Sequence, residues 1–471
     1  MVNCQHIVAV LFIGMIFLGG CRATSPGPRG KKPYNVLFIA VDDLNDWVGS
    51  LGGHPHASTP HIDRLAERGI LFEQAYCPAP LCNPSRTAIL MGLSPSTTGI
   101  YENRTWFRDL PEYEDWVTLP QYFQKHGYQT LAGGKIFHHP QGKMSDPNSW
   151  EKVYQTEVGT PYPAPLEQHK NGLRGKFGDA TISTALDWAG LDVNDEACAD
   201  WQTADRAAQY LQQDHERPFF LACGIFRPHL RWYAPQPYFD LHPIDEVVLP
   251  PYIENDLDDV PKAGKQMAGW YFSAIKEHGQ WRPGVQAYLA CSSFADACVG
   301  QVLDALENSP HKDNTIVVLW GDHGWHLGEK DHWAKLALWE PASRTPFIIY
   351  VPGNKKGKRC SHPVNLLDMH ATLIELCDLP PRDDIEGRSL APLVKKPTKK
   401  WPYPAVMTHG YQNHAVRNPQ YRYIRYADGS DELYDLQADP NEWTNLANKR
   451  AYIKVKRELA EWLPEENTKA R

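Results

Sequence analysis

Four short apolar runs predict buried strands. They cover residues 35–41, 218–225, 314–320 and 347–351, and their length suits strands that are covered on both faces. A further short strand is predicted at residues 128–132. Segments with the 3.6-residue period of helices stand between them, at residues 59–68, 119–126, 200–213 and 366–379 and in a long helix that begins at Pro283. Because strands and helices alternate, we expect an α/β fold with a mostly parallel sheet and helices on both faces.

The pattern changes after a basic, proline-bearing stretch at residues 395–404. Short alternating strands between residues 405 and 436 and a closing helix at residues 451–462 predict a small antiparallel sheet. We therefore expect a catalytic domain over residues 33–394 and a smaller C-terminal α+β domain over residues 395–471. Residues 141–178 show no periodic signal and predict loops that face the substrate.

The N-terminus predicts export. An apolar run at residues 7–18 is too short to span a membrane and ends in small residues, as in a secretory signal peptide of residues 1–21. Leu18-Gly19-Gly20-Cys21 resembles a bacterial lipobox, whose cysteine becomes lipidated, with a plain cleaved signal as the alternative. Residues 22–32 would then form a flexible tether. We expect a secreted or periplasmic protein, and in the lipobox interpretation its only membrane contact is a lipid on Cys21.

Charge and cysteine content exclude some classes of function. The net charge of −8 argues against a nucleic-acid-binding protein, although a pocket of local positive charge remains compatible with an anionic substrate. No Cys-x-x-Cys pair is present, so a structural zinc site is not expected. Without Cys4, Cys21 and Cys82, seven cysteines are left, so at least one does not pair within the chain.

Polar side chains follow four of the predicted strands. They are Asp42 and Asp43, Lys135 and His138, His229, and Asp322 and His323. Ligands of open α/β sheets bind outside the carboxyl ends of the strands, so we expect these side chains to meet. Three carboxylates suit a hard divalent cation, Ca²⁺ or alternatively Mg²⁺, whereas the imidazole of His323 is an unusual ligand for it.

The stretch from Cys82 to Gly92 places a thiol, Pro84, Ser85 and Arg86 at the start of a helix-capable run. The free N–H groups of a helix N-terminus and a guanidinium together favour an anion. The segment resembles the signature of type I sulfatases, C-x-P-S-R-x-x-x-[LM]-[ST]-G, with Met91 at the Ser/Thr position. Asp322-His323 and the run Trp333-Ala334-Lys335 further resemble the iduronate-2-sulfatase branch of that family.

The resemblance implies an alkaline-phosphatase-like fold and a cysteine, Cys82, that a formylglycine-generating enzyme oxidises to formylglycine. It implies that Asp42, Asp43, Asp322 and His323 bind the metal together with the modified Cys82. It also implies that Arg86, Lys135, His138, His229 and Lys335 line the sulfate pocket. In these roles the hydrated aldehyde attacks sulfur, His229 or Lys335 protonates the leaving alkoxide, and His138 takes the proton that lets the aldehyde reform.

The expected function is therefore hydrolysis of a sulfate ester on a sugar, with a 2-O-sulfated uronate as the favoured substrate by resemblance. Two alternatives stay open at this point. One is a phosphate or phosphonate ester hydrolase of the same superfamily, since three Asp and a nucleophile also suit phosphoryl transfer. The other is a non-catalytic glycan-binding lipoprotein in which Cys82 stays a thiol.

Overall fold

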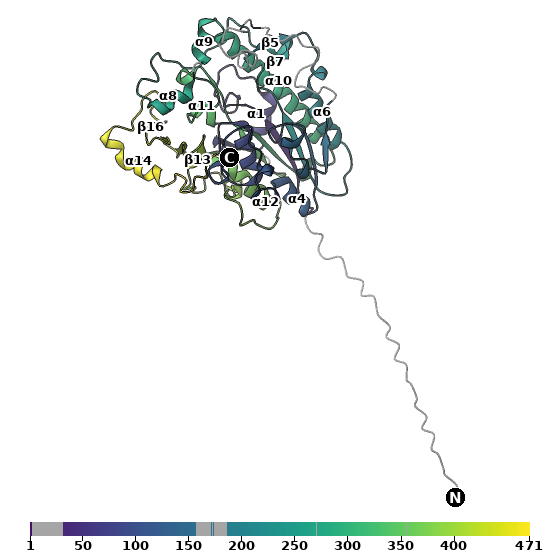
Figure 1. The fold of residues 1–471 in the computed structure, drawn as a ribbon. Helices are drawn as coiled ribbons and strands as arrows, with labels where there is room; N and C mark the ends of the chain where they lie inside the picture. Colours follow the sequence, from purple (N-terminus) through teal and green to yellow (C-terminus); the bar gives the residue numbers. More distant parts are fainter. Residues whose placement is uncertain (2–31, 157–170, 172, 174–185, 270, 355) are drawn as a thin grey trace. The chain divides into compact units, whose positions relative to one another are not determined.

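The computed structural model describes Met1 and residues 32–156, 171, 173, 186–269, 271–354 and 356–471 (Figure 1). The predicted signal peptide, lipobox and tether lie outside the described residues, apart from Met1 and Lys32. Residues 33–471 form one compact unit, and the description below concerns this unit.

An eight-stranded sheet with the order β12-β2-β11-β8-β1-β6-β3-β4 lies at the centre of the unit. Its strands are β1 (Asn35–Val41), β2 (Ile70–Tyr76), β3 (Gln129–Gly134), β4 (Lys152–Tyr154), β6 (Phe219–Ile225), β8 (Thr315–Gly321), β11 (Phe347–Tyr350) and β12 (Lys358–Asn365). All neighbouring pairs are parallel except those of β11, which runs against both β8 and β2. Seven of these eight strands therefore point the same way.

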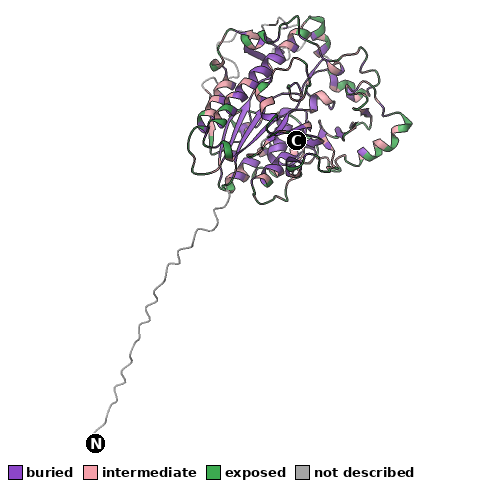
Figure 2. Cartoon of the chain, turned by 180° about the vertical axis from the view of Figure 1, so that it is seen from behind, coloured by how far each residue is buried: buried purple, intermediate pink, exposed green. Residues whose placement is uncertain are grey.

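Helices cover both faces of the sheet because alternate residues of the strands point to opposite sides. In β1, Leu37 and Ile39 belong to one buried cluster and Val36 and Phe38 to the other. The first cluster is completed by α1 (Pro60–Ala66), α6 (Ala199–Leu211) and α10 (Trp281–Glu307). The second is completed by α2 (Cys82–Met91), α4 (Leu119–Lys125) and α12 (Met369–Leu376). Figure 2 shows the buried strands between helices whose outer sides are exposed.

Helix α10 packs along α6 (Figure 1). Within the described residues it alone is long and apolar enough to cross a membrane. Its apolar side chains, such as Val285, Leu289 and Val299, are buried in the first core cluster, so its composition is that of a core helix.

A separate four-stranded antiparallel sheet follows near the C-terminus, with neighbouring strands in chain order. It consists of β13 (Ala405–Thr408), β14 (His414–Arg417), β15 (Tyr421–Arg425) and β16 (Asp431–Asp435), and it packs against α14 (Ile453–Ala460). The remaining α-helices of the described residues are α3 (Pro95–Thr98), α7 (Gln236–Asp240), α8 (Lys262–Ala268), α9 (Tyr271–Glu277), α11 (Glu340–Ser343) and α13 (Ala391–Lys395). Two small sheets pair β5 (Trp188–Leu191) with β7 (Trp232–Pro235) and β9 (His326–Leu327) with β10 (Trp333–Ala334).

The predicted fold class is confirmed, a mostly parallel sheet between helices followed by a small antiparallel sheet. Some predicted details were wrong. Helix α10 begins at Trp281 and not at Pro283, because a proline in the first turn removes an N–H that has no partner inside the helix. The predicted loop region at residues 141–178 contains a strand, β4, which pairs with β3 at the edge of the sheet; beyond residue 156, only residues 171 and 173 of this region belong to the described residues.

Candidate active site

The four polar clusters come together because their strands are neighbours. Strands β8, β1, β6 and β3 are adjacent and parallel, so their carboxyl ends lie side by side. Asp322 and His323 follow β8, Asp42 and Asp43 follow β1, His229 follows β6, and Lys135 and His138 follow β3. The edge of the sheet that sequence analysis singled out is therefore the place where these side chains gather.

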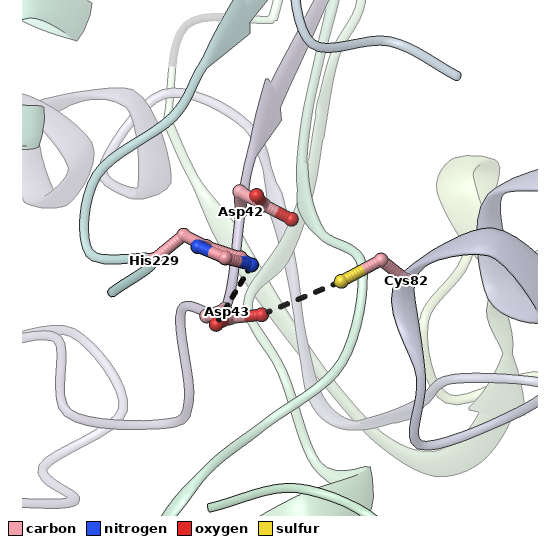
Figure 3. Close-up of side chains that lie close together, drawn as sticks. All are labelled: Asp42, Asp43, Cys82 and His229. Atoms are coloured by element: carbon pink, nitrogen blue, oxygen red, sulfur yellow. Dashed lines mark hydrogen bonds and ion pairs between the residues drawn. The ribbon is translucent and has the colours of Figure 1, made fainter. Parts of the chain in front are cut away.

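Helix α2 points its first residue, Cys82, at this edge. Figure 3 shows its thiol directed toward the Asp43 carboxylate, with His229 on the other side of that carboxylate. The Sγ atom lies 3.8 Å from Asp43 Oδ1, 3.3 Å from His323 Nε2 and 3.0 Å from Lys335 Nζ. The thiol is completely buried. Any nucleophile formed from Cys82 is thus surrounded by one carboxylate and two basic groups.

Arg86, one turn further along α2, joins two of the carboxylates. Its Nε donates to Asp322 Oδ2 at 2.7 Å and its Nη2 to Asp42 Oδ1 at 2.9 Å. Its Nη1 donates to the carbonyl oxygens of Lys135 and Ile136. Because this guanidinium is fully buried and its fork is occupied by protein oxygens, its role here is to fix the carboxylates rather than to hold a substrate anion.

Two lysines compensate the remaining negative charge. Lys135 Nζ donates to Asp42 Oδ2 at 2.5 Å, and Lys335 Nζ donates to Asp43 Oδ1 at 2.7 Å. Burial opposes ionisation of the Cys82 thiol, but Lys135, Lys335 and His323 outweigh it and hold the pKa of this thiol well below its usual value. The position of the sulfur is therefore one where negative charge is stabilised.

The titratable groups of the site have pKa values that are shifted in different directions. Burial of Asp42 is outweighed by Lys135 and Arg86, which lower its pKa. Burial raises the pKa of Asp322 to about 6 against the opposing charge of Arg86. The pKa of His323 rises to about 9 because Asp322 outweighs the effect of burial. These shifts reflect carboxylates and cations packed together in one buried site, and a divalent cation bound there would alter the pKa values of its ligands further.

The donor set fits a divalent cation. Asp42, Asp43 and Asp322 are each fully buried, and Asp43 Oδ2 has no hydrogen-bond partner among the described residues. Ligand atoms of Asp43, Cys82, Asp322 and His323 all lie within 4.8 Å of one another. Several carboxylate oxygens close together, one of them without a hydrogen-bond partner, are typical of Ca²⁺ and Mg²⁺ sites.

The two predicted proton carriers lie at the mouth of the site. His229 is partly exposed, and its Nε2 is 3.9 Å from Asp43 Oδ2. His138 lies within hydrogen-bonding reach of the Cys82 thiol, and its Nδ1 is a buried atom that has no partner in the described part of the chain. Both imidazoles therefore lie beside groups of the site, His229 at Asp43 and His138 at Cys82.

Sequence analysis missed the residues that hold this site in place. Ser85 Oγ donates to the carbonyl of Asp322 at 2.6 Å, and Tyr288 OH donates to the carbonyl of Asp43 at 2.7 Å. Ala334 and Leu336, on either side of Lys335, have positive φ angles of 104° and 75°. The loop is held by the His332 ring, whose Nε2 lies 2.6 Å from the Lys335 carbonyl oxygen. The contacts of Ser85 and Tyr288 join distant segments, that of His332 lies within one loop, and all three are contacts to backbone carbonyls, which no local sequence signal marks.

Comparison with known proteins identifies the family. The model of the family described as Sulfatase matches residues 34–379, and that described as N-sulphoglucosamine sulphohydrolase, C-terminal, matches residues 328–469. A protein named "Sulfatase" from Formosa agariphila is 40% identical over 470 residues, which cover 97% of this chain and 92% of the relative. This chain belongs to the sulfatase family. It is accordingly a sulfuric ester hydrolase, as the resemblance around Cys82 implied.

A second named relative and a solved structure are also similar to this chain. The human protein "Iduronate 2-sulfatase" is 31% identical over 364 residues, covering 73% of this chain and 65% of the relative, so the chain spans about two thirds of that protein. A solved structure in complex with its substrate D-glucosamine-2-N,6-O-disulfate matches with a TM-score of 0.72 and 22% identity, and the match covers 92% of this chain and 97% of that one. At that identity the match shows the fold, which confirms the expected alkaline-phosphatase-like architecture.

Proposed function

We propose that this sulfatase removes sulfate from a sulfated saccharide through a formylglycine derived from Cys82. The observation that carries the proposal is the surroundings of the Cys82 sulfur, a buried position with Lys335 at 3.0 Å, His323 at 3.3 Å and Asp43 at 3.8 Å. The sulfur marks where the aldehyde oxygens of a matured residue would lie. A structural cysteine would have apolar neighbours instead.

A divalent cation, Ca²⁺ or alternatively Mg²⁺, belongs to the proposal. Asp42, Asp43, Asp322 and His323 would hold it next to residue 82. When bound, it supplies Lewis-acid stabilisation of negative charge on the sulfate and on the nucleophile. A bound cation would also give Asp43 Oδ2 the partner that it lacks among the described residues.

Side chains of the protein stabilise charge, position the carboxylates and transfer protons. Lys135 and Lys335 offset negative charge on the sulfonyl oxygens during transfer, and Arg86 keeps Asp42 and Asp322 in place. A hydroxyl of the hydrated aldehyde loses its proton to water at this position, where Lys335 and His323 stabilise negative charge, and its oxygen forms the bond to sulfur as the bond from sulfur to the sugar oxygen breaks. His229 then protonates the leaving sugar oxygen, a role that Lys335 could share.

His138 completes the cycle. It takes the proton of the second hydroxyl, the carbon–oxygen bond to sulfate breaks with its electron pair going to sulfate, and the aldehyde reforms. Water then restores the hydrate. The half-buried imidazole next to residue 82, with one free nitrogen, suits this base.

The proposed substrate class is a glycan that carries a 2-O-sulfated uronate. Support comes from the 31% identity to the protein named "Iduronate 2-sulfatase" and from Asp322-His323, the pair that resembles that branch. We further propose that the chain is exported, that Cys21 carries a lipid, and that a formylglycine-generating enzyme matures Cys82. These three proposals rest on the sequence alone.

The test compares Cys82→Ala with Cys77→Ala. Both thiols are buried and lie five residues apart, so the Cys77 variant controls for loss of a core sulfur. We expect Cys82→Ala to abolish hydrolysis of a 2-O-sulfated uronate disaccharide with an unchanged circular dichroism spectrum, and Cys77→Ala to keep most activity. Residual turnover in Cys82→Ala within tenfold of the wild type would exclude the mechanism.

The same assay addresses the alternatives. Faster hydrolysis of a phosphonate monoester than of any sulfate ester would favour the phosphonate hydrolase. A protein that binds glycans, turns over neither class of ester and retains the Cys82 thiol would favour the binding lipoprotein.

A further inference from the structure

A cavity lined by none of the catalytic side chains has part of its wall at the same edge of the sheet as the active site. Its volume is about 470 Å³, within the usual range of small-ligand sites. Asn365, the last residue of β12, and Pro78, two residues after β2, form part of its wall. Both strands run parallel to β1, so the cavity and the catalytic side chains share the carboxyl ends of the strands.

The distance between the two sites suits a chain of sugars. Strand β12 is four places from β1 in the sheet, and strands are spaced by about 4.8 Å, which separates the two strand ends by about 19 Å. A single sugar at Cys82 does not reach that far. Only an oligosaccharide occupies both places.

Aromatic side chains form one part of the cavity wall. Tyr403 and Trp462 both line it, with ring centroids 6.1 Å apart and ring planes at 90°. Trp462 is 38% exposed, which is unusual for so large an apolar side chain. Tyr and Trp present a flat apolar face and a polar tip. A pyranose ring matches such a surface, because its C–H groups can pack on the apolar face and its hydroxyls can bond the polar tip.

Polar groups in the cavity are already oriented. Asp368 Oδ1 accepts the backbone N–H of Arg388 at 2.8 Å, and Glu386 Oε2 accepts the N–H of Ser94 at 2.9 Å. The Arg388 guanidinium stacks on Tyr403 at 4.5 Å, and in the described part of the chain it donates no hydrogen bond. Its N–H groups are therefore available to ligand hydroxyls.

The negative charge of the cavity lining favours an uncharged sugar over a sulfated or acidic one. Asp368, Glu386, Glu465 and Glu466 line the cavity against the single cation of Arg388. An excess of carboxylates repels sulfated units and uronates, whereas an uncharged pyranose gains hydrogen bonds from the same oxygens. The active site has the opposite preference, with Lys135 and Lys335 close to Cys82.

We infer that this cavity is a distal subsite for an uncharged pyranose unit of an oligosaccharide whose sulfated unit lies at residue 82. The inference rests on the proposed function, since it requires a saccharide substrate. The inference adds a requirement for substrate length, because only oligosaccharides long enough to reach the cavity bind more tightly through it.

The experiment measures kcat/KM on two substrates of different length. One is a 2-O-sulfated uronate disaccharide, too short to reach the cavity, and the other is a hexasaccharide with the same sulfated end and N-acetylated, unsulfated hexosamines. Trp462→Ala and Tyr403→Ala should lower kcat/KM on the hexasaccharide five- to twentyfold, mainly through a higher KM. On the disaccharide, kcat/KM of both variants should stay within twofold of the wild-type value. Trp462→Phe, which keeps an aromatic face, should restore most of the loss, and Tyr452→Ala serves as a matched aromatic control outside the cavity.

Equal effects of Trp462→Ala on both substrates, or no effect on either, would overturn the inference. A wild-type protein that hydrolyses neither substrate would contradict the proposed function instead. In that case binding of the desulfated hexasaccharide to the wild type and to Trp462→Ala, measured by saturation transfer difference NMR, still decides the inference. Signals of the hexosamines that vanish in the variant support it, and equal or absent signals in both proteins refute it.

Discussion

Replacing Arg86 by glutamine tests the idea that this residue holds the catalytic carboxylates. The guanidinium makes two ion pairs with fully buried partners, Asp42 and Asp322, and donates to two backbone carbonyls. Removing one partner of a buried ion pair costs about 3–5 kcal/mol, because the other charge stays buried and unpaired. Total stabilities are about 5–15 kcal/mol, so the loss is a large share of the whole. We expect Arg86→Gln to unfold at a clearly lower urea concentration and to lose activity.

A matched control separates the charge pair from any general effect of losing an arginine. Arg64 also pairs with an aspartate, Asp304, but both side chains are more than a third exposed, and exposed pairs contribute about 0–1 kcal/mol. Urea unfolding would be followed by tryptophan fluorescence, with EDTA present so that no cation replaces the lost charge. If Arg86→Gln and Arg64→Gln shift the free energy of unfolding by the same small amount, the assigned role of Arg86 is wrong.

Three further predictions follow from the site and its support. Lys335→Ala should lower kcat by about 10²–10³, the usual cost of one electrostatic group aimed at developing charge, and should also lower the free energy of unfolding, because Asp43 then stays buried without this ion-pair partner; a loss of kcat below fivefold would contradict the contact with residue 82. EDTA should abolish hydrolysis and lower the melting temperature, and Ca²⁺ at a hundred times its dissociation constant should restore about 2.7 kcal/mol; full activity after exhaustive chelation would remove the cation from the account. Burial raises the pKa of Asp296 to about 7 even though it accepts two backbone N–H groups at the start of α1, so its stabilising contribution is complete below pH 4 and is lost as the pH rises through 7. The stability of Asp296→Asn relative to the wild type should therefore improve between pH 4 and pH 8 in urea titrations, and a constant difference would refute the shift.

The sequence predicted the strands that build the site because those strands are buried on both faces. Residues 35–41 and 314–320 are continuous apolar runs, and they form β1 and β8 almost to the residue. Strands β2 and β12 escaped prediction for the opposite reason. Glu73 and Gln74 interrupt the apolar run of β2, and β12 is an edge strand with exposed charges and a proline, Pro363, at an irregularity of its register.

The site residues that directly follow a strand could be predicted from the sequence. The contacts that depend on how segments pack against one another could not. The polar residues after β1, β3, β6 and β8 were found by that rule, and the structure brings them together. The partners of Arg86 were not predicted, because a guanidinium near a helix start suggests a bound anion as readily as two buried carboxylates. The constraint on Lys335 by His332 was equally invisible, since it is a contact to a backbone carbonyl within a loop of unusual φ angles.

The central claim, that Cys82 is matured to an aldehyde, is tested most directly by mass spectrometry of protein from its native host or from co-expression with a formylglycine-generating enzyme. The tryptic peptide from Gly69 to Arg86 contains both Cys77 and Cys82, so Cys77 is an internal control for thiol chemistry. The account predicts alkylation of Cys77 alone, together with the mass loss expected when the CH₂SH group of residue 82 becomes an aldehyde that reacts with hydrazides. Alkylation of both thiols in active enzyme would contradict it.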